Sequence, residues 1–357
     1  MNLSDVLNSY QHLIPNVIQR EPLTSEKNRW VKHRIGDIDY LVAQPVTFTP
    51  YASATACSAR CLFCSENLRE EQTQIHSSLL RPSDLYFSQL GLALQELRGL
   101  PISYSLSGLE MTDDKQWFIK LMGLLSSHDA KSPVEQKVLY SNGSGFVDIE
   151  NDEVFSNAIE SFGLTWIELS RHHFDDVKNQ NIMRFRSGNK IASNASFAKV
   201  IANVQKNTSI KLVCILQHQG IDDLPSLITY LDWAKVMGVS HVIFRELSVL
   251  DETYKANRTF NYIASSRVSV GELLKAFLER YSPEIKYSTN GYYFSNLVVE
   301  HEGIDVTFES SNYTDLRNKH DSGKIFKLIF HANGNLCADW NPDKHVLFSS
   351  KGLNHVE

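Results

Sequence analysis

Residues 40–250 alternate between short β-rich runs and helical stretches, and this alternation limits the possible folds more than any other feature of the chain. The helical stretches, such as "DLPSLITYLDWAKVMG", carry apolar residues at the spacing of an amphipathic helix. Strands separated by helices of this length are joined by right-handed crossovers and form a parallel sheet. The predicted strands lie at 40–52, 102–108, 135–145, 164–170, 209–217 and 239–247. The sequence therefore predicts an α/β fold, either a doubly wound sheet or a partial (β/α)6 TIM-like barrel, with its chemistry at the carboxyl ends of the strands.

The alternation of strands and helices ends after residue 250. One helical segment, "SVGELLKAFLERY", is followed by two segments that read as antiparallel hairpins with turns at "HEG" and "NGN". We therefore expect an N-terminal extension over 1–44, the partial barrel over 45–250, and a C-terminal α+β extension with β-hairpins over 251–357 that caps the barrel.

Composition indicates a globular protein. The chain has 357 residues, is 42% hydrophobic and carries a net charge of −6, which disfavours a nucleic-acid partner because such surfaces are usually basic. No apolar run approaches the roughly 20 residues that cross a bilayer, and the N-terminus lacks the regions of a signal peptide. We expect a cytoplasmic protein without a membrane partner.

Three of the five cysteines, Cys57, Cys61 and Cys64, lie on one loop directly after the first predicted strand. Three thiolates on one loop are one ligand short of the four that a [4Fe-4S] cubane needs, so one iron would stay open. A structural zinc site with His76 as the fourth ligand is the alternative, and it would make the chain a non-catalytic zinc-binding interaction protein. An odd number of cysteines also fits a reducing compartment.

The cysteine spacing, with Phe63 just before the last cysteine, resembles the signature of the radical S-adenosylmethionine (radical SAM) superfamily. The resemblance implies that the open iron binds the amino and carboxylate groups of S-adenosyl-L-methionine. One electron then splits this cofactor into methionine and a 5′-deoxyadenosyl radical that abstracts hydrogen from a substrate. It also implies an electron donor such as flavodoxin or ferredoxin.

The resemblance continues at the ends of the following strands. Gly108 and Glu110 in "SLSGLEMT" are similar to the Gly-Gly-Glu segment that receives the methionine amino group, although Ser107 replaces the first glycine and a leucine intervenes. Ser141 and Asn142 in "YSNGSG" resemble the Thr-Asn-Gly turn of the molybdenum-cofactor cyclase branch. By the same resemblance, the remaining candidates for contacts to the cofactor are Ser170, Arg171, Gln217 and Arg245.

Other polar residues near the strand ends are harder to assign. His172 and His173 are adjacent on an extended segment, so at most one of them faces the barrel mouth unless a bulge intervenes. Arg184 and Arg186 are further candidates for an anionic contact, and exposed positions at a helix start are the alternative.

The chain lacks the extra cysteines that hold auxiliary clusters in many radical SAM relatives, since only Cys214 and Cys337 remain, and we expect both to be buried apolar residues. The tail "KIFKLIFHANGNLCADW" loosely resembles the C-terminal hairpin of the cyclase, but without its partner cysteines. We therefore predict a small polar substrate, such as a nucleoside, sugar or amino-acid derivative. Modification of a ribosomal peptide is the alternative among enzymes.

Overall fold

The computed structural model describes residues 1–20, 22–23, 25–68, 80–250 and 253–350. The six predicted strands are present, and each is hydrogen-bonded in parallel to the next one along the chain. They are β3 (Ile38–Tyr51), β4 (Ile102–Leu106), β5 (Val134–Ser141), β6 (Trp166–Ser170), β7 (Ser209–Leu216) and β8 (His241–Glu246). The sheet curves but its two edge strands do not pair with each other. The prediction of an α/β fold with a partial barrel is confirmed.

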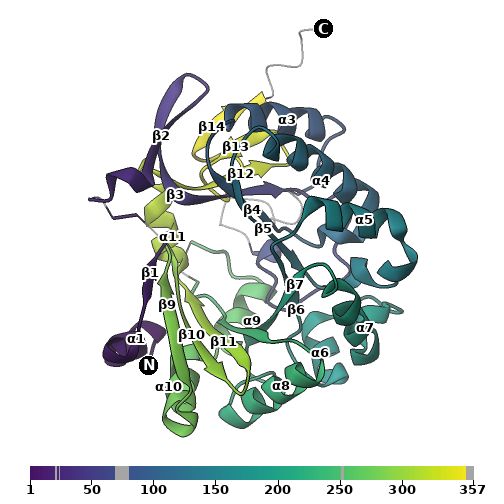
Figure 1. Ribbon diagram of the computed structural model, residues 1–357, viewed down its shortest axis with the longest axis vertical. Helices are drawn as coiled ribbons and strands as arrows, with labels where there is room; N and C mark the ends of the chain where they lie inside the picture. Colours follow the sequence, from purple (N-terminus) through teal and green to yellow (C-terminus); the bar gives the residue numbers. More distant parts are fainter. Residues whose placement is uncertain (21, 24, 69–79, 251–252, 351–357) are drawn as a thin grey trace.

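The helices that connect these strands lie along the outer side of the curved sheet (Figure 1). They are α3 (Tyr86–Glu96), α4 (Lys115–Asp129), α5 (Glu153–Phe162), α6 (Asp176–Met183), α7 (Asn194–Val204) and α8 (Leu224–Val236). Most begin at an Asp or Ser side chain that accepts a hydrogen bond from a first-turn N–H group, as Asp114 does for α4 and Asp223 for α8. Helix α6 has little apolar periodicity, and the sequence did not predict it.

The C-terminal extension adds strands to both edges of this sheet. After α9 (Arg258–Ser266), its elements are α10 (Val270–Tyr281), β9 (Glu284–Asn290), β10 (Phe294–His301), β11 (Ile304–Ser311), α11 (Tyr313–His320), β12 (Ile325–His331), β13 (Asn335–Cys337) and β14 (Val346–Ser349). The expected hairpin of β10 and β11 is antiparallel, and β11 then pairs in parallel with β8. At the opposite edge β12 pairs in parallel with β3. The extension therefore shares one sheet with the barrel strands, and its boundary at residue 251 stays a prediction.

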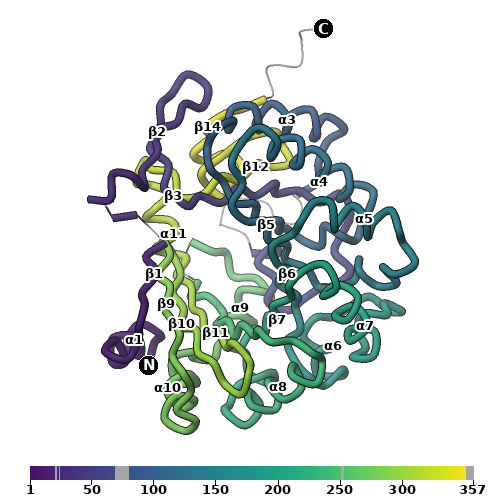
Figure 2. The backbone as a smooth tube through the Cα atoms, in the orientation of Figure 1, coloured from purple at the N-terminus to yellow at the C-terminus, as the bar shows by residue number. Residues whose placement is uncertain are grey.

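The N-terminal residues also join the sheet. Helix α1 (Leu3–Ser9) precedes β1 (Val17–Gln19), which pairs in parallel with β9, and β2 (Trp30–Ile35) forms a hairpin with β3. Figure 2 shows the purple N-terminal segment running beside the green strand β9. Short 3₁₀ helices lie at Gln11–Leu13, Lys27–Arg29, Ser65–Asn67, Met111–Asp113, Ser144–Phe146, Ile149–Asn151 and Lys190–Ala192.

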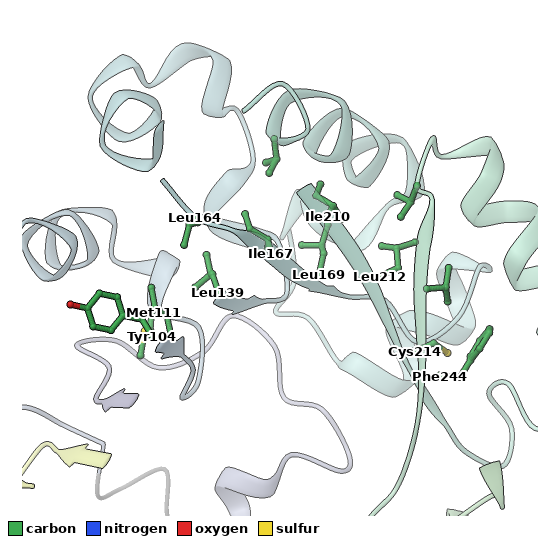
Figure 3. Close-up of a cluster of buried hydrophobic side chains, with 14 of the residues drawn as sticks. Tyr104, Met111, Leu139, Leu164, Ile167, Leu169, Ile210, Leu212, Cys214 and Phe244 are labelled. Carbon is green, nitrogen blue, oxygen red and sulfur yellow. The ribbon is translucent and has the colours of Figure 1, made fainter. Parts of the chain in front are cut away.

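The two faces of the central strands have different environments. Figure 3 shows apolar side chains between the sheet and the helices, among them Leu139, Ile167 and Leu212. Because successive side chains of a strand point to opposite faces, the alternate residues line the inner face, where Glu168 and Ser170 follow Ile167 along β6. The helix side therefore holds the core, and the inner side holds polar groups. No described helix is long and apolar enough to span a membrane.

Candidate functional site

A cavity of about 680 Å³ lies on the inner face of the curved sheet. This volume is within the range of about 300–1,000 Å³ that is usual for small-molecule sites. Side chains from all six central strands and from the extension line it, and the cysteine loop after β3 forms part of its wall. Polar groups from distant parts of the sequence therefore face one enclosed space.

The cysteine loop places its three thiols on this cavity. Cys57, Cys61 and Cys64 are half-buried, line the cavity and form no disulfide. The last residues of α6 and the segment that follows hold the loop from outside, through three backbone hydrogen bonds and one guanidinium. These bonds run from Arg60 N to Met183 O (2.9 Å), Leu62 N to Ile182 O (3.1 Å), Arg186 N to Ser58 O (3.0 Å) and Arg186 Nη2 to Ala56 O (3.2 Å).

A second set of hydrogen bonds holds the start of the loop against β4 and β5. The Ser58 amide donates to Asp113 Oδ2 (2.6 Å), and the Ser58 hydroxyl donates to Ser144 Oγ (2.8 Å). Asn142 Nδ2 donates to Ser58 Oγ (3.1 Å) and lies 3.5 Å from Cys57 Sγ. The Ala59 amide also donates to this sulfur, over 3.4 Å. Cys57 thus has N–H donors of the kind that tune the thiolates of iron-sulfur sites.

The thiols fit an iron-sulfur cluster chemically. Burial raises the pKa of all three, that of Cys61 to about 12, because a thiolate is costly in this poorly solvated wall. A bound cation removes this cost, since a coordinating thiol is deprotonated outright. Three thiols on one cavity wall match the donor set of a cubane with one open iron.

Among the described residues, no three His, Cys, Asp or Glu side chains are grouped as ligands of a single metal ion. A cubane has a different requirement, because it carries each thiolate on a different iron. His76, the predicted fourth ligand of a zinc site, lies outside the described residues.

Glu110 and its neighbours form the cavity wall beside Cys57. The Glu110 side chain is 1% exposed, and burial raises its pKa to about 7. Its carboxylate accepts hydrogen bonds from Ser141 Oγ (2.9 Å), Asn142 N (2.5 Å) and Thr112 Oγ1 (2.5 Å). The carboxylate therefore joins the ends of β4 and β5, and the structure brings the predicted Glu110, Ser141 and Asn142 together.

Gly108 has a positive φ of 114°, which favours glycine, and a Cβ there would lie 3.0 Å from the Tyr51 ring. It lines the cavity together with Ser170 and Phe63.

The two adjacent histidines point in different directions, as the alternation of an extended segment requires. His172 lines the cavity, packs edge-on against Phe63 with ring centroids 4.9 Å apart, and accepts a hydrogen bond at Nδ1 from Ile215 N (3.1 Å). Burial lowers the pKa of His172 to about 3, so its ring is neutral at neutral pH. His173 is outside the cavity lining and accepts at Nδ1 from Asp175 N (2.8 Å).

No protein-family model matches this sequence, and no curated protein matches it significantly. Solved structures do resemble it. The structure of anSMEcpe with bound S-adenosylmethionine superposes with a TM-score of 0.51 at 15% identity, covering 88% of this chain and 78% of that one. The chain therefore has the fold of anSMEcpe.

Streptococcus suis SuiB bound to S-adenosylmethionine is also similar, with a TM-score of 0.47 and 13% identity over 84% of this chain. The chain spans 61% of the length of SuiB.

Two of the predicted cofactor residues do not line the cavity of this fold. Arg171 is fully buried on the helix side, where its guanidinium donates to the carbonyl oxygens of Ile191 and Ala192. Gln217 is also buried, and its Oε1 accepts a hydrogen bond from Tyr262 of α9 (2.7 Å). Both side chains are already paired within the protein, so the structure gives no support for their predicted contacts.

Arg245 does line the cavity, but two carboxylates hold it. Its Nε donates to Glu309 Oε1 (2.6 Å) and its Nη2 to Glu168 Oε2 (3.2 Å). Burial opposes the charged guanidinium, but these carboxylates outweigh burial and raise its pKa. Glu309 comes from β11, and the sequence did not indicate it because no local pattern predicts that β11 lies beside β8.

A second pocket, of about 610 Å³, lies outside the cysteine loop and is lined by Cys61 together with exposed arginines. These are Arg60, Arg184, Arg186 and Arg258. Arg184 and Arg186 were predicted as anionic contacts, and the structure places them here rather than in the first cavity. The sequence did not indicate Arg258 because it comes from α9, far from the loop in the chain.

Proposed function

We propose that this protein is a radical SAM enzyme that binds one [4Fe-4S] cluster through Cys57, Cys61 and Cys64 and S-adenosylmethionine in the adjoining cavity. The observation that supports it most is that these three thiols face the same cavity as Glu110 and Asn142 within the fold that the chain shares with anSMEcpe. When bound, the cluster would supply the electron that cleaves S-adenosylmethionine to methionine and a 5′-deoxyadenosyl radical.

The chain's own residues would orient the cofactor and exclude water. Ser141 and Asn142 offer hydroxyl and amide groups beside Cys57, and Ser170 offers a hydroxyl on the next strand. Phe63 and the neutral ring of His172 form an uncharged part of the wall. Such a wall keeps solvent and stray hydrogen donors away from a reactive intermediate.

The substrate would be a small polar molecule. The cavity also carries charged groups, among them Glu168, Lys211 and Arg245, which suit hydrogen bonds to a polar compound. The hydrogen abstracted by the radical would come from a carbon held between these groups and the cysteine loop.

We also propose that an acidic electron donor, such as a flavodoxin or ferredoxin, docks at the pocket of four arginines. Charge complementarity supports this assignment, because the pocket is basic while the chain carries a net charge of −6, and Cys61 contributes to the pocket. Arg258→Glu should slow reduction by a flavodoxin at low salt and leave reduction by dithionite unchanged. If flavodoxin reduces Arg258→Glu as fast as it reduces the wild-type protein, this docking site is contradicted.

Anaerobic reconstitution tests the cluster. The purified chain should bind about four irons and four sulfides, and the triple alanine variant of Cys57, Cys61 and Cys64 should bind none. Cys214→Ala is the matched control, because Cys214 is fully buried within β7 and away from the cavity lining, so its removal should leave the iron content unchanged. One equivalent of zinc with no cubane would favour the zinc-binding interaction protein instead.

Turnover tests the chemistry. The reconstituted protein should produce 5′-deoxyadenosine when it is given dithionite and S-adenosylmethionine. A fully loaded cluster that releases no 5′-deoxyadenosine would refute the proposed activity.

A further inference from the structure

Lys327 in the large cavity has no anionic partner among the described residues. Lys327 lies in the middle of β12, is 7% exposed, and lines the cavity. Its ammonium nitrogen lies 4.3 Å from the centre of the Trp340 ring. Within the described part of the chain, no carboxylate or other acceptor bonds to this nitrogen. A buried charge without a partner is costly, and the pKa of Lys327 is lowered to about 7, first by burial and then by the charge of Arg20.

Two other cations of the cavity, Arg245 and Lys211, lie beside carboxylates. Arg245 has two carboxylate partners, Glu168 and Glu309. Lys211 lies 3.9 Å from the Trp166 ring, and Glu168 acts favourably on its charge. Lys327 and Arg20 are therefore the cavity lysine and arginine that form no ion pair with a carboxylate in the described part of the chain.

Two further donors reach the same part of the cavity from the opposite edge of the sheet. The ring of Tyr292, in the turn between β9 and β10, stacks on Phe326 next to Lys327, with centroids 5.6 Å apart. Its hydroxyl is buried without a hydrogen-bond partner among the described residues. Arg20 follows β1, is held by a backbone hydrogen bond to Asn290 O (2.8 Å), and lines the cavity.

The three side chains can all donate hydrogen bonds, and two of them are cationic. Ammonium, guanidinium and phenol groups together match an oxyanion, which accepts several hydrogen bonds and neutralises the buried charge. We propose that Lys327, Arg20 and Tyr292 bind an anionic group of the substrate, a carboxylate or a phosphate. The term substrate rests on the proposed function, whereas the anion site itself does not.

The surroundings of the site connect it to the cysteine loop. The Trp340 ring meets the Tyr51 ring at a centroid distance of 5.0 Å, and the Tyr51 hydroxyl bonds to Glu66, two residues after Cys64. A small acid anchored at Lys327 would therefore extend along the cavity with its other end towards the cysteines. This geometry narrows the substrate class from polar molecules to acids.

The test is anion binding by the full chain, measured by calorimetry with and without the reconstituted cluster. The probes are inorganic phosphate and acetate, and the tighter one identifies the anionic group. Tryptophan emission provides a second measurement, because the anion would sit beside Trp340. Lys327→Met should weaken binding at least tenfold, Lys327→Arg should retain it, and Tyr292→Phe should weaken it by a smaller factor. Lys131→Met is the matched control, because Lys131 is an exposed lysine outside the cavity lining and its loss should leave the affinity unchanged.

Two outcomes would overturn the anion site. One is that neither anion binds the wild-type chain, and the other is that Lys327→Met binds as tightly as wild type. If Lys327→Met does not fold, Tyr292→Phe removes a single oxygen and decides the question. Production of 5′-deoxyadenosine without substrate does not depend on Lys327, so failure of the proposed chemistry and failure of the anion site give different results.

Discussion

Arg171 has one role in the sequence-based prediction and another in the structure, so a substitution there can separate the two. The sequence resemblance makes it a contact of the cofactor carboxylate. In the structure it is fully buried and its guanidinium joins the loop before α7 to α6, through Ile191 O (3.1 Å), Ala192 O (3.1 Å), Asn194 Oδ1 (2.7 Å) and Asp176 Oδ1 (2.6 Å). We therefore expect Arg171→Met to lower stability rather than cofactor affinity.

The magnitude follows from the groups that lose their donor. Three buried or partly buried acceptors, two carbonyls and the Asn194 amide oxygen, each lose a hydrogen bond worth about 1 kcal/mol. The guanidinium also lies 5.0 Å from the Phe197 ring, a cation–π contact worth about 1 kcal/mol. The Asp176 side chain is 46% exposed, so its ion pair adds little. The expected loss in the free energy of unfolding is about 4 kcal/mol.

Urea unfolding followed by circular dichroism measures this loss. Arg171→Lys keeps the charge but cannot reach all four acceptors, and it should lose about half as much. Arg60→Met removes an exposed arginine and should change the free energy of unfolding by less than about 0.5 kcal/mol. The reasoning is refuted if Arg171→Met unfolds at the wild-type urea concentration but no longer binds S-adenosylmethionine.

Three other predictions concern the cavity wall and the loops behind it. In Gly145→Ala the new methyl group would lie 2.3 Å from the Thr112 carbonyl oxygen, so urea unfolding should show a loss above about 3 kcal/mol. Glu309→Gln leaves Arg245 with one carboxylate and should cost about 2 kcal/mol in the same assay. The third is a pH effect. The imidazole of His172 protonates near pH 6.5 when unfolded but only near 3 when folded, so stability should fall as pH drops through this window. The loss is up to about 1.4 kcal/mol per pH unit, and His172→Gln should reduce the slope.

Local patterns predicted the central strands and the cysteine loop because both depend on residues close together in the chain. The alternation along β6 even separates Glu168 and Ser170, which face the cavity, from Ile167 in the core. The same alternation places Arg171 on the opposite side from Ser170, although the resemblance made it a candidate for the cavity. Helix α6 went unpredicted because its sequence, "DVKNQNIM", lacks a continuous apolar face.

The contributions of the extension could not be predicted, since they depend on pairing between strands far apart in the chain. Lys327 reaches the cavity because β12 pairs with β3, which is more than 270 residues earlier. A signal was present, because a single lysine interrupts the apolar run "KIFKLIF". That signal marks an unusual buried charge but does not say which residues face it.

The described barrel wall has a seam that lacks a backbone ladder. Between the turn after β9 and strand β12, the Tyr292 and Phe326 rings meet without any hydrogen bond between the described strands, and the Trp30 ring also packs on Phe326, with centroids 5.6 Å apart. Separating two such rings costs about 1 kcal/mol, whereas separating two neighbouring strands breaks several backbone hydrogen bonds at once. Opening of this wall by thermal motion therefore costs the least free energy at the contact between Tyr292 and Phe326, next to Lys327.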